Sequence, residues 1–157
     1  MLTVRSLIEL RDHIGLTLPP SDWLLIDQKM IDDFSQLTGD KNWYHVDVER
    51  AKRELPGGKT LAHGLLTLSL IPGMASQIVR VTHHGRALNY GFEKVRYPAP
   101  VHADSRVRLH MTVLSAVADK GGIMLTRRYV MELEGSERPA MSADMLSLIF
   151  ESEDSKN

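Results

Sequence analysis

An aspartate and a histidine five positions apart, Asp40 and His45, are the residues of this sequence best suited to acid–base chemistry. A carboxylate and an imidazole placed around one water molecule can activate it and pass a proton to a reacting group. On a regular helix, a spacing of five residues points two side chains about 140° apart, because one turn takes 3.6 residues. The two side chains therefore converge only where the chain is irregular, and Gly39 supplies such a break directly before Asp40.

Each of these residues also has an ordinary structural interpretation. Asp40 is then a solvated turn aspartate behind a helix C-cap, and His45 is a half-buried histidine held by hydrogen bonds. Asn42, between them, is better suited to orienting the loop or to hydrogen-bonding a site residue than to chemistry. The histidine pair His83–His84 has no metal-ligand spacing relative to Asp40 and His45, so no metal site is predicted.

The segments on both sides of this pair are predicted to be helices. Asp27 stands where an N-cap belongs, and Gly39 stands where a C-cap glycine belongs. The residues between them place apolar side chains on one helical face: Met30, Ile31, Phe34 and Leu37. Asp47 can cap a second short helix that runs to about Leu55. The polar residues 40–45 therefore form a loop between two helices.

A third and longer helix is predicted from His63 to about Val79. Its side chains are apolar nearly all round, which is typical of a buried helix, and Pro72 should kink it. Toward the N-terminus we expect a helix over residues 4–13, a loop over 16–22 and a short strand over 23–26. Residues 1–20 thus form an N-terminal helix and loop, and residues 151–157 form a flexible tail.

The C-terminal half is predicted to be a β-sheet. Apolar and polar residues alternate over 106–113 and again over 123–133, with a turn at Gly121–Gly122 between them. Residues 86–97 and 140–150 give two further strands. A sheet that buries one face needs a cover, and the long helix is available for it. The order of elements predicts an α+β fold in one domain over 1–157; it fits a sheet wrapped around one helix and other α+β layers equally.

Composition excludes several classes of protein. The formal net charge is −1 without a basic cluster, which argues against a nucleic-acid partner. The absence of cysteine excludes disulfides, thiolate catalysis and cysteine-ligated zinc. There is neither a signal-peptide pattern nor an apolar run of the roughly 18 residues that a spanning helix needs. We therefore expect a cytoplasmic protein with no membrane partner.

Three motifs resemble the MaoC-like family of (R)-specific enoyl-thioester hydratases. The first, over residues 34–45, has the family's Gly-Asp-x-Asn unit followed by a histidine and later a small residue, filled here by Gly39, Asp40, Asn42, His45 and Ala51. Trp43-Tyr44 stand where the family usually has proline and an aliphatic residue, and this variation resembles the NodN-like branch. The runs 62–70 and 89–101 match that branch as well. The resemblance covers roughly residues 21–150.

The resemblance implies a hot-dog fold, in which an antiparallel sheet wraps a central helix, and reversible hydration of trans-2-enoyl thioesters to (R)-3-hydroxyacyl thioesters. Asp40 and His45 are implied to hold and activate the water. The backbone amide of Gly64, at the start of the central helix, is implied to bind the thioester carbonyl. A helix N-terminus offers free N–H groups and a positive dipole end, and glycine allows close approach. Space for helix packing is the other interpretation of Gly64.

The roles of the remaining candidates stay open. His63 either lines the pocket or serves the start of the helix. A helix hydroxyl is expected near the acid–imidazole pair, and either Thr67 or Ser69 can supply it. Asn89 either hydrogen-bonds the site from a strand or occupies a strand bulge.

Two alternative functions use the same fold. One is thioester hydrolysis, which also uses a carboxylate and a helix-end amide; the other is non-catalytic binding of acyl-CoA or signalling. No metal or redox cofactor is expected, because coenzyme A or a carrier-protein arm belongs to the substrate. We expect a homodimer, because the hot-dog family usually pairs its sheets and a single chain does not easily bury both the helix and a sheet edge.

Overall fold

The computed structural model describes residues 1–83 and 85–150 of the 157-residue chain. Its main sheet has the order β2-β6-β7-β8-β5, with β3 also paired to β6. The long strands are antiparallel to their neighbours: β5 (Arg86–Arg96), β6 (Ser105–Asp119), β7 (Gly122–Leu133) and β8 (Met141–Phe150). Short strands β2 (Thr17–Leu18) and β3 (Leu24–Ile26) pair with β6. All four predicted C-terminal strands, the turn near Gly121 and the short strand before Asp27 are confirmed.

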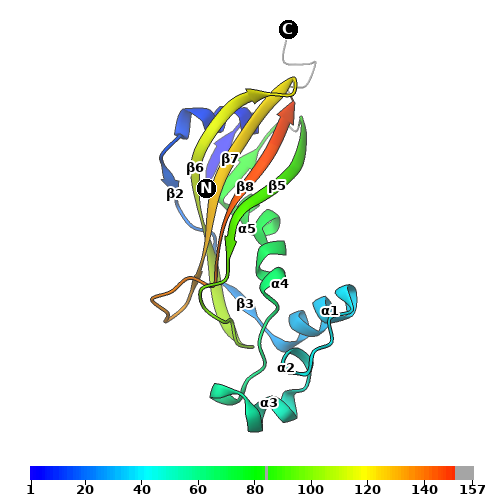
Figure 1. Ribbon diagram of the computed structural model, residues 1–157. Coiled ribbons are helices and arrows are strands. Elements are labelled where there is room, and N and C mark those ends of the chain that lie inside the picture. The colour runs from blue at the N-terminus through cyan, green and yellow to red at the C-terminus, as the bar shows by residue number, and fades with distance from the viewer. Residues whose placement is uncertain (84, 151–157) are drawn as a thin grey trace.

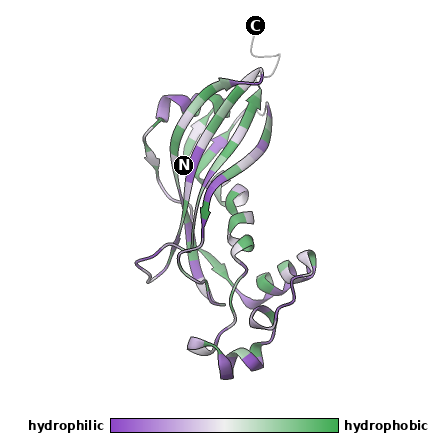
Figure 2. Ribbon diagram, in the orientation of Figure 1, coloured by the Kyte–Doolittle hydropathy of each residue, from purple (hydrophilic) through white to green (hydrophobic). Residues whose placement is uncertain are grey.

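Two consecutive helices, α4 (Gly64–Ser69) and α5 (Ile71–Ile78), lie along one face of this curved sheet (Figure 1). The alternation along β6 buries every second side chain against them: Val107, Leu109, Met111 and Val113. Hydrophobic residues accordingly predominate on β7 and β8, whereas β5 is mixed and α3 and the β7–β8 loop are largely hydrophilic (Figure 2). The fold is α+β, an antiparallel sheet wrapped around helices in the hot-dog arrangement.

The predicted kink at Pro72 is confirmed, because the helix is interrupted at Leu70, two residues before the proline, and the second part ends at Ile78, where a strand begins at Val79. The prediction that this helix is buried nearly all round is wrong. Its buried side chains lie on one side only: Leu66, Thr67, Ile71, Met74 and Ile78. Leu65, on the other side, is 61% exposed. The reason is that one sheet covers only one side of a helix, so the apolar residues on the opposite side stay uncovered in the single chain.

Three short helices lie beyond the end of the sheet (Figure 1): α1 (Gln28–Thr38), α2 (Trp43–Val46) and α3 (Val48–Glu54). The caps predicted for α1 and α3 are confirmed. Asp27 Oδ1 accepts a hydrogen bond of 2.8 Å from the Met30 N–H, and Asp47 caps α3 in the same way. Gly39 ends α1 with a φ of 80°, a left-handed conformation that favours glycine. Leu37, in contrast, is 84% exposed and not part of the buried face.

The N-terminal prediction needs correction. Residues 4–13 are not one α-helix: β1 (Leu2–Val4) pairs in parallel with β4 (Val79–Val81), and a 3₁₀ helix, η1 (Leu7–His13), follows. The pairing with β4 holds Val4 in an extended conformation. Ser6 then caps η1 by accepting a hydrogen bond from the Ile8 N–H. The predicted loop 16–22 contains β2, and the break after α3 forms a second 3₁₀ turn, η2 (Pro56–Gly58).

Within the described residues, no helix combines the length and the apolar character needed to cross a membrane. Two expectations fall outside the described residues: the tail 151–157, and His84 of the His83–His84 pair.

Candidate active site

Asp40 follows the C-cap of α1 and is held on both its backbone and its side chain. The Ser35 hydroxyl donates a 2.6 Å hydrogen bond to the Asp40 carbonyl. The Asn42 amide donates to Asp40 Oδ1 at 2.7 Å, and the Asn42 backbone N–H points to the same oxygen at 3.4 Å. The backbone hydrogen bond from Asn42 is the largest cause that lowers the pKa of Asp40 below its ordinary value. Asp40 is therefore a carboxylate whose second oxygen, Oδ2, is free to act.

His45 sits on the one-turn helix α2 rather than in the predicted loop, and it is only 7% exposed. Its Nδ1 lies 2.6 Å from the carbonyl oxygen of Leu61. A carbonyl only accepts, so Nδ1 carries the proton and Nε2 of the neutral ring presents a lone pair. Burial is the largest cause that lowers the pKa of His45 below its ordinary value. The Gln28 amide donates to the His45 carbonyl at 2.9 Å and anchors α2 against α1.

The free atoms of the two residues face each other across a gap. Asp40 Oδ2 lies 4.0 Å from His45 Nε2. That separation is too long for a hydrogen bond, but it allows one water molecule to lie within about 2.8 Å of both atoms. Because both atoms are acceptors, the water can donate one hydrogen to each and keep its lone pairs free. Asp40 and His45 thus converge although they are five residues apart, because the first precedes the helix that carries the second.

His63 forms the third side of this cluster. Its ring stacks on His45 with centroids 3.6 Å apart and an interplanar angle of 21°, and the tilted ring of Phe34 lies 5.1 Å from it, centroid to centroid. Its Nε2 donates a 3.1 Å hydrogen bond to the Asp40 carbonyl and lies 4.0 Å from Asp40 Oδ2. Its Nδ1 is buried without a hydrogen-bond partner among the described residues. His63 therefore touches both members of the pair.

Three side chains of the kinds that bind metal ions meet here, so their geometry can be compared with that of a metal site. One atom from each of Asp40, His45 and His63 lies within 4.8 Å of the others. However, His63 Nε2 is bonded to a carbonyl, and the two rings are stacked. Both rings would have to turn to bring their nitrogens to the roughly 2.0 Å distance that zinc takes. The arrangement fits hydrogen bonding around a water better than it fits metal ligation.

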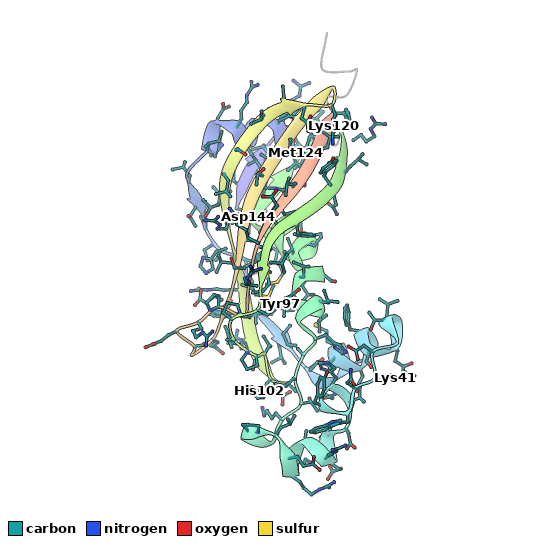
Figure 3. All side chains as sticks on the ribbon, in the orientation of Figure 1. Lys41, Tyr97, His102, Lys120, Met124 and Asp144 are labelled. Carbon is teal, nitrogen blue, oxygen red and sulfur yellow. The ribbon has the colours of Figure 1, made fainter. Side chains whose placement is uncertain are left out.

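Gly64 follows His63 and begins α4. Its N–H has no acceptor among the described residues. A Cβ at this position would lie 3.1 Å from the ring of Tyr97, which sits beside the start of α4 (Figure 3). Glycine is thus needed for packing against Tyr97, and the same lack of a side chain leaves the amide approachable. Both interpretations of Gly64 keep structural support.

The other candidates are placed less directly. The Thr67 hydroxyl donates to the Gly64 carbonyl at 2.6 Å and the Ser69 hydroxyl donates to Leu65 at 2.8 Å, so both turn back onto the helix. Asn89 lies on β5 opposite Ser147, next to a register shift, and faces a cavity under α5 rather than Asp40. The Leu61 carbonyl was not foreseen, because a backbone acceptor leaves no signal in the sequence.

Comparison with known proteins finds a matching family and close relatives of this chain. The family description "MaoC like domain" matches residues 10–133. The chain is 40% identical over 148 residues to 3-hydroxyacyl-thioester dehydratase Z of Mycobacterium tuberculosis, covering 93% of this chain and 97% of that protein. It is also 40% identical to nodulation protein N of Rhizobium leguminosarum bv. viciae, covering 92% and 91% of the two chains.

A likeness of fold extends to more distant structures. The HadBC (3R)-hydroxyacyl-ACP dehydratase complex of Mycobacterium tuberculosis superposes with a TM-score of 0.72 at 14% identity, covering 87% of this chain and 97% of that chain. The family match extends over most of the chain and includes the segment that carries Asp40 and His45. From its sequence and its fold together, this chain belongs to the MaoC-like family.

Proposed function

We propose that this protein is a hydro-lyase that interconverts trans-2-enoyl thioesters and (R)-3-hydroxyacyl thioesters. The observation that carries the proposal is the 4.0 Å separation between Asp40 Oδ2 and His45 Nε2, with the imidazole tautomer set by the Leu61 carbonyl. The name of the mycobacterial relative, a 3-hydroxyacyl-thioester dehydratase, supports the same reaction.

In the hydration direction, one water donates its two hydrogens to Asp40 Oδ2 and His45 Nε2. Its oxygen attacks C3 of the enoyl group, while the electrons of the double bond move toward the thioester carbonyl. The proton that the water loses passes to Asp40 or His45, and one of these residues delivers a proton to C2 on the same face. The product thus gains the hydroxyl group at C3 and the hydrogen at C2 that together make up one water, and dehydration reverses each step.

The negative charge that develops on the thioester oxygen needs a donor. We assign this role to the Gly64 N–H, which stands at the start of α4 and makes no hydrogen bond to any described residue. A fixed amide at a helix N-terminus stabilises an oxyanion better than a neutral carbonyl. Asn42 and His63 are positioning residues in this scheme, because both bind Asp40.

The proposed chemistry needs no resident cofactor, since the substrate brings its own coenzyme A or carrier arm. We further propose a homodimer. The edge strand β5 exposes Leu88, Tyr90 and Phe92, and Leu65 on α4 is exposed as well. Unpaired strand edges with apolar side chains are commonly covered by a second copy.

An assay with crotonyl-CoA tests the proposed reaction. Loss of the enoyl absorbance without release of free thiol is the expected result. Release of thiol at the rate of substrate loss would instead indicate a thioesterase. Tight binding with neither change, repeated over several enoyl-CoA lengths, would indicate a binding protein.

A further inference from the structure

A cavity lies between α5 and the sheet, away from Asp40 and His45. Its volume is about 580 Å³, and its walls include Ile71 and Ala75 of α5, Arg127 and Tyr129 of β7, Asn89 and Ser147. Ile71 comes seven residues after Gly64. At 1.5 Å per helical residue, the cavity begins about 10 Å along the helix from the Gly64 amide. That distance is within the reach of an acyl chain whose thioester is held at Gly64.

Arg127 is the unusual residue of this cavity. It alternates along β7 with Leu125 and Tyr129, both fully buried, and it is itself only 7% exposed. One terminal nitrogen donates to the Ser147 hydroxyl at 2.6 Å, whereas Nε is buried and finds no hydrogen-bond partner in the part of the chain that the structure describes. No acidic side chain among the described residues forms an ion pair with it.

The next residue on the strand shows what a compensated arginine looks like in this sheet. Arg128, on the opposite face, makes two hydrogen bonds to the Asp144 carboxylate, at 2.8 and 3.0 Å. Arg127 has the same fork of donors but lacks the carboxylate. The guanidinium carbon of Arg127 lies 5.6 Å from the centroid of the Tyr129 ring, but this cation–π contact satisfies none of its hydrogen-bond donors. A buried guanidinium without a carboxylate destabilises a fold, and an apolar residue of similar size would be tolerated better. A retained buried charge beside an open cavity is therefore best explained by a ligand.

We propose that Arg127 binds a carboxylate at the far end of the substrate's acyl group, so that the preferred substrates are thioesters of dicarboxylic acids. This inference rests on the proposed function, because it takes the thioester to be held at Gly64. A guanidinium binds a carboxylate through two parallel hydrogen bonds, and Asn89 and Ser147 add polar groups beside it. Arg80 adds a second positive charge to the wall, and no acidic residue of the described chain lines the cavity.

Calorimetry with matched pairs of saturated acyl-CoAs tests the proposal without requiring turnover. Adipyl-, suberyl- and sebacyl-CoA are compared with hexanoyl-, octanoyl- and decanoyl-CoA. In at least one pair, the carboxylate-ended ligand should bind about tenfold more tightly or better, because hydrogen bonds to charged groups are the strong ones. Arg127→Met should abolish this preference, and Arg127→Lys should keep part of it. Arg127→Met is expected to fold, since it removes a buried charge, and thermal unfolding checks this.

Arg106→Met is the matched control, because Arg106 is half exposed and pairs with Glu134 outside the cavity. It should leave the preference unchanged. The proposal is overturned if no pair favours the carboxylate, or if the preference survives in Arg127→Met. It is also overturned if free adipate binds as tightly as adipyl-CoA in an Arg127-dependent way, because the site then serves a separate small anion.

Turnover of the corresponding trans-2-enoyl-CoAs separates this proposal from the proposed function. If both series are hydrated without preference for the carboxylate, the role of Arg127 is refuted and the proposed reaction stands. If the binding preference depends on Arg127 but neither series is hydrated, the proposed reaction is refuted and the carboxylate-binding site is supported.

Discussion

Asp40 Oδ2 and His45 Nε2 lie 4.0 Å apart, and each is the one atom of its side chain left free by the surrounding hydrogen bonds. Asn42 occupies the other oxygen of the carboxylate, and the Leu61 carbonyl occupies the other nitrogen of the imidazole. The site is therefore preorganised to receive one small donor, such as a water, between two acceptors.

The pH dependence of hydration should report the ionisation of His45. Protonation of Nε2 removes the lone pair that accepts from the water, so activity falls as the pH decreases. Because burial lowers the pKa of His45 below 6.5, the fall should be centred below pH 6.5. The Asp40 carboxylate stays ionised throughout, since its pKa is lowered as well. The measurement is kcat/KM for crotonyl-CoA between acidic and neutral pH, and a fall centred above pH 6.5 would contradict this assignment.

His63→Phe should weaken catalysis more than binding. The phenyl ring can keep the stack on His45, but it cannot donate to the Asp40 backbone carbonyl, so the loop that carries the carboxylate loses an anchor. We expect kcat to fall by about tenfold, the usual effect of one lost hydrogen bond, with little change in KM.

The same substitution offers a second readout. The charge of His63 lowers the pKa of His45, so its removal should shift the acid limb of the pH profile upward. His63→Gln, which can still donate to the Asp40 carbonyl, should recover part of the lost kcat. An unchanged kcat and an unchanged profile in His63→Phe would show that His63 only fills space.

Substitutions at Gly64 and Tyr97 separate the two roles of the glycine. Gly64→Ala should reduce hydration, because its methyl group meets the Tyr97 ring at 3.1 Å and also stands beside the amide. In the double variant Gly64→Ala, Tyr97→Leu the packing conflict is relieved. If the amide binds the thioester, activity should stay low while the melting temperature recovers. Recovery of both would assign Gly64 to packing alone.

The edge strand gives a prediction about assembly. Light scattering should report a dimer, and Phe92→Lys should weaken it by placing a charge on the exposed edge of β5. Leu37→Lys, on the exposed side of α1, is the matched control and should remain dimeric. A monomer at assay concentrations that hydrates crotonyl-CoA normally would remove the homodimer from the proposal.

The elements that were predicted correctly depend on local signals. Asp27 and Gly39 act within one helical turn of themselves, and the alternation along β6 depends only on which face is buried. The errors arise where distant segments decide the outcome. Val4 joins a strand because it pairs with Val81, which no pattern near residue 4 indicates.

In the site, too, the residues predicted correctly are close in sequence, and those missed depend on contacts between distant segments. The motif around Gly39 led to Asp40, Asn42 and His45, which lie close together along the chain. The stack of His63 on His45 and the bond from His45 to the Leu61 carbonyl bring a later segment back onto α2. Such contacts depend on the tertiary path of the chain, so the sequence left the role of His63 open. The burial of Arg127 was not predicted for another reason. Within an alternating strand it takes a position that normally holds an apolar residue.

The most direct test of the account is the hydration of crotonyl-CoA by Asp40→Asn. This change keeps the size of the side chain and removes its capacity to accept a proton. We predict that kcat/KM falls by about 100-fold or more, the scale of a lost general acid–base group, while the melting temperature changes little. Asp33→Asn, an exposed position on α1, should keep wild-type activity. Full hydration activity in Asp40→Asn would contradict the mechanism.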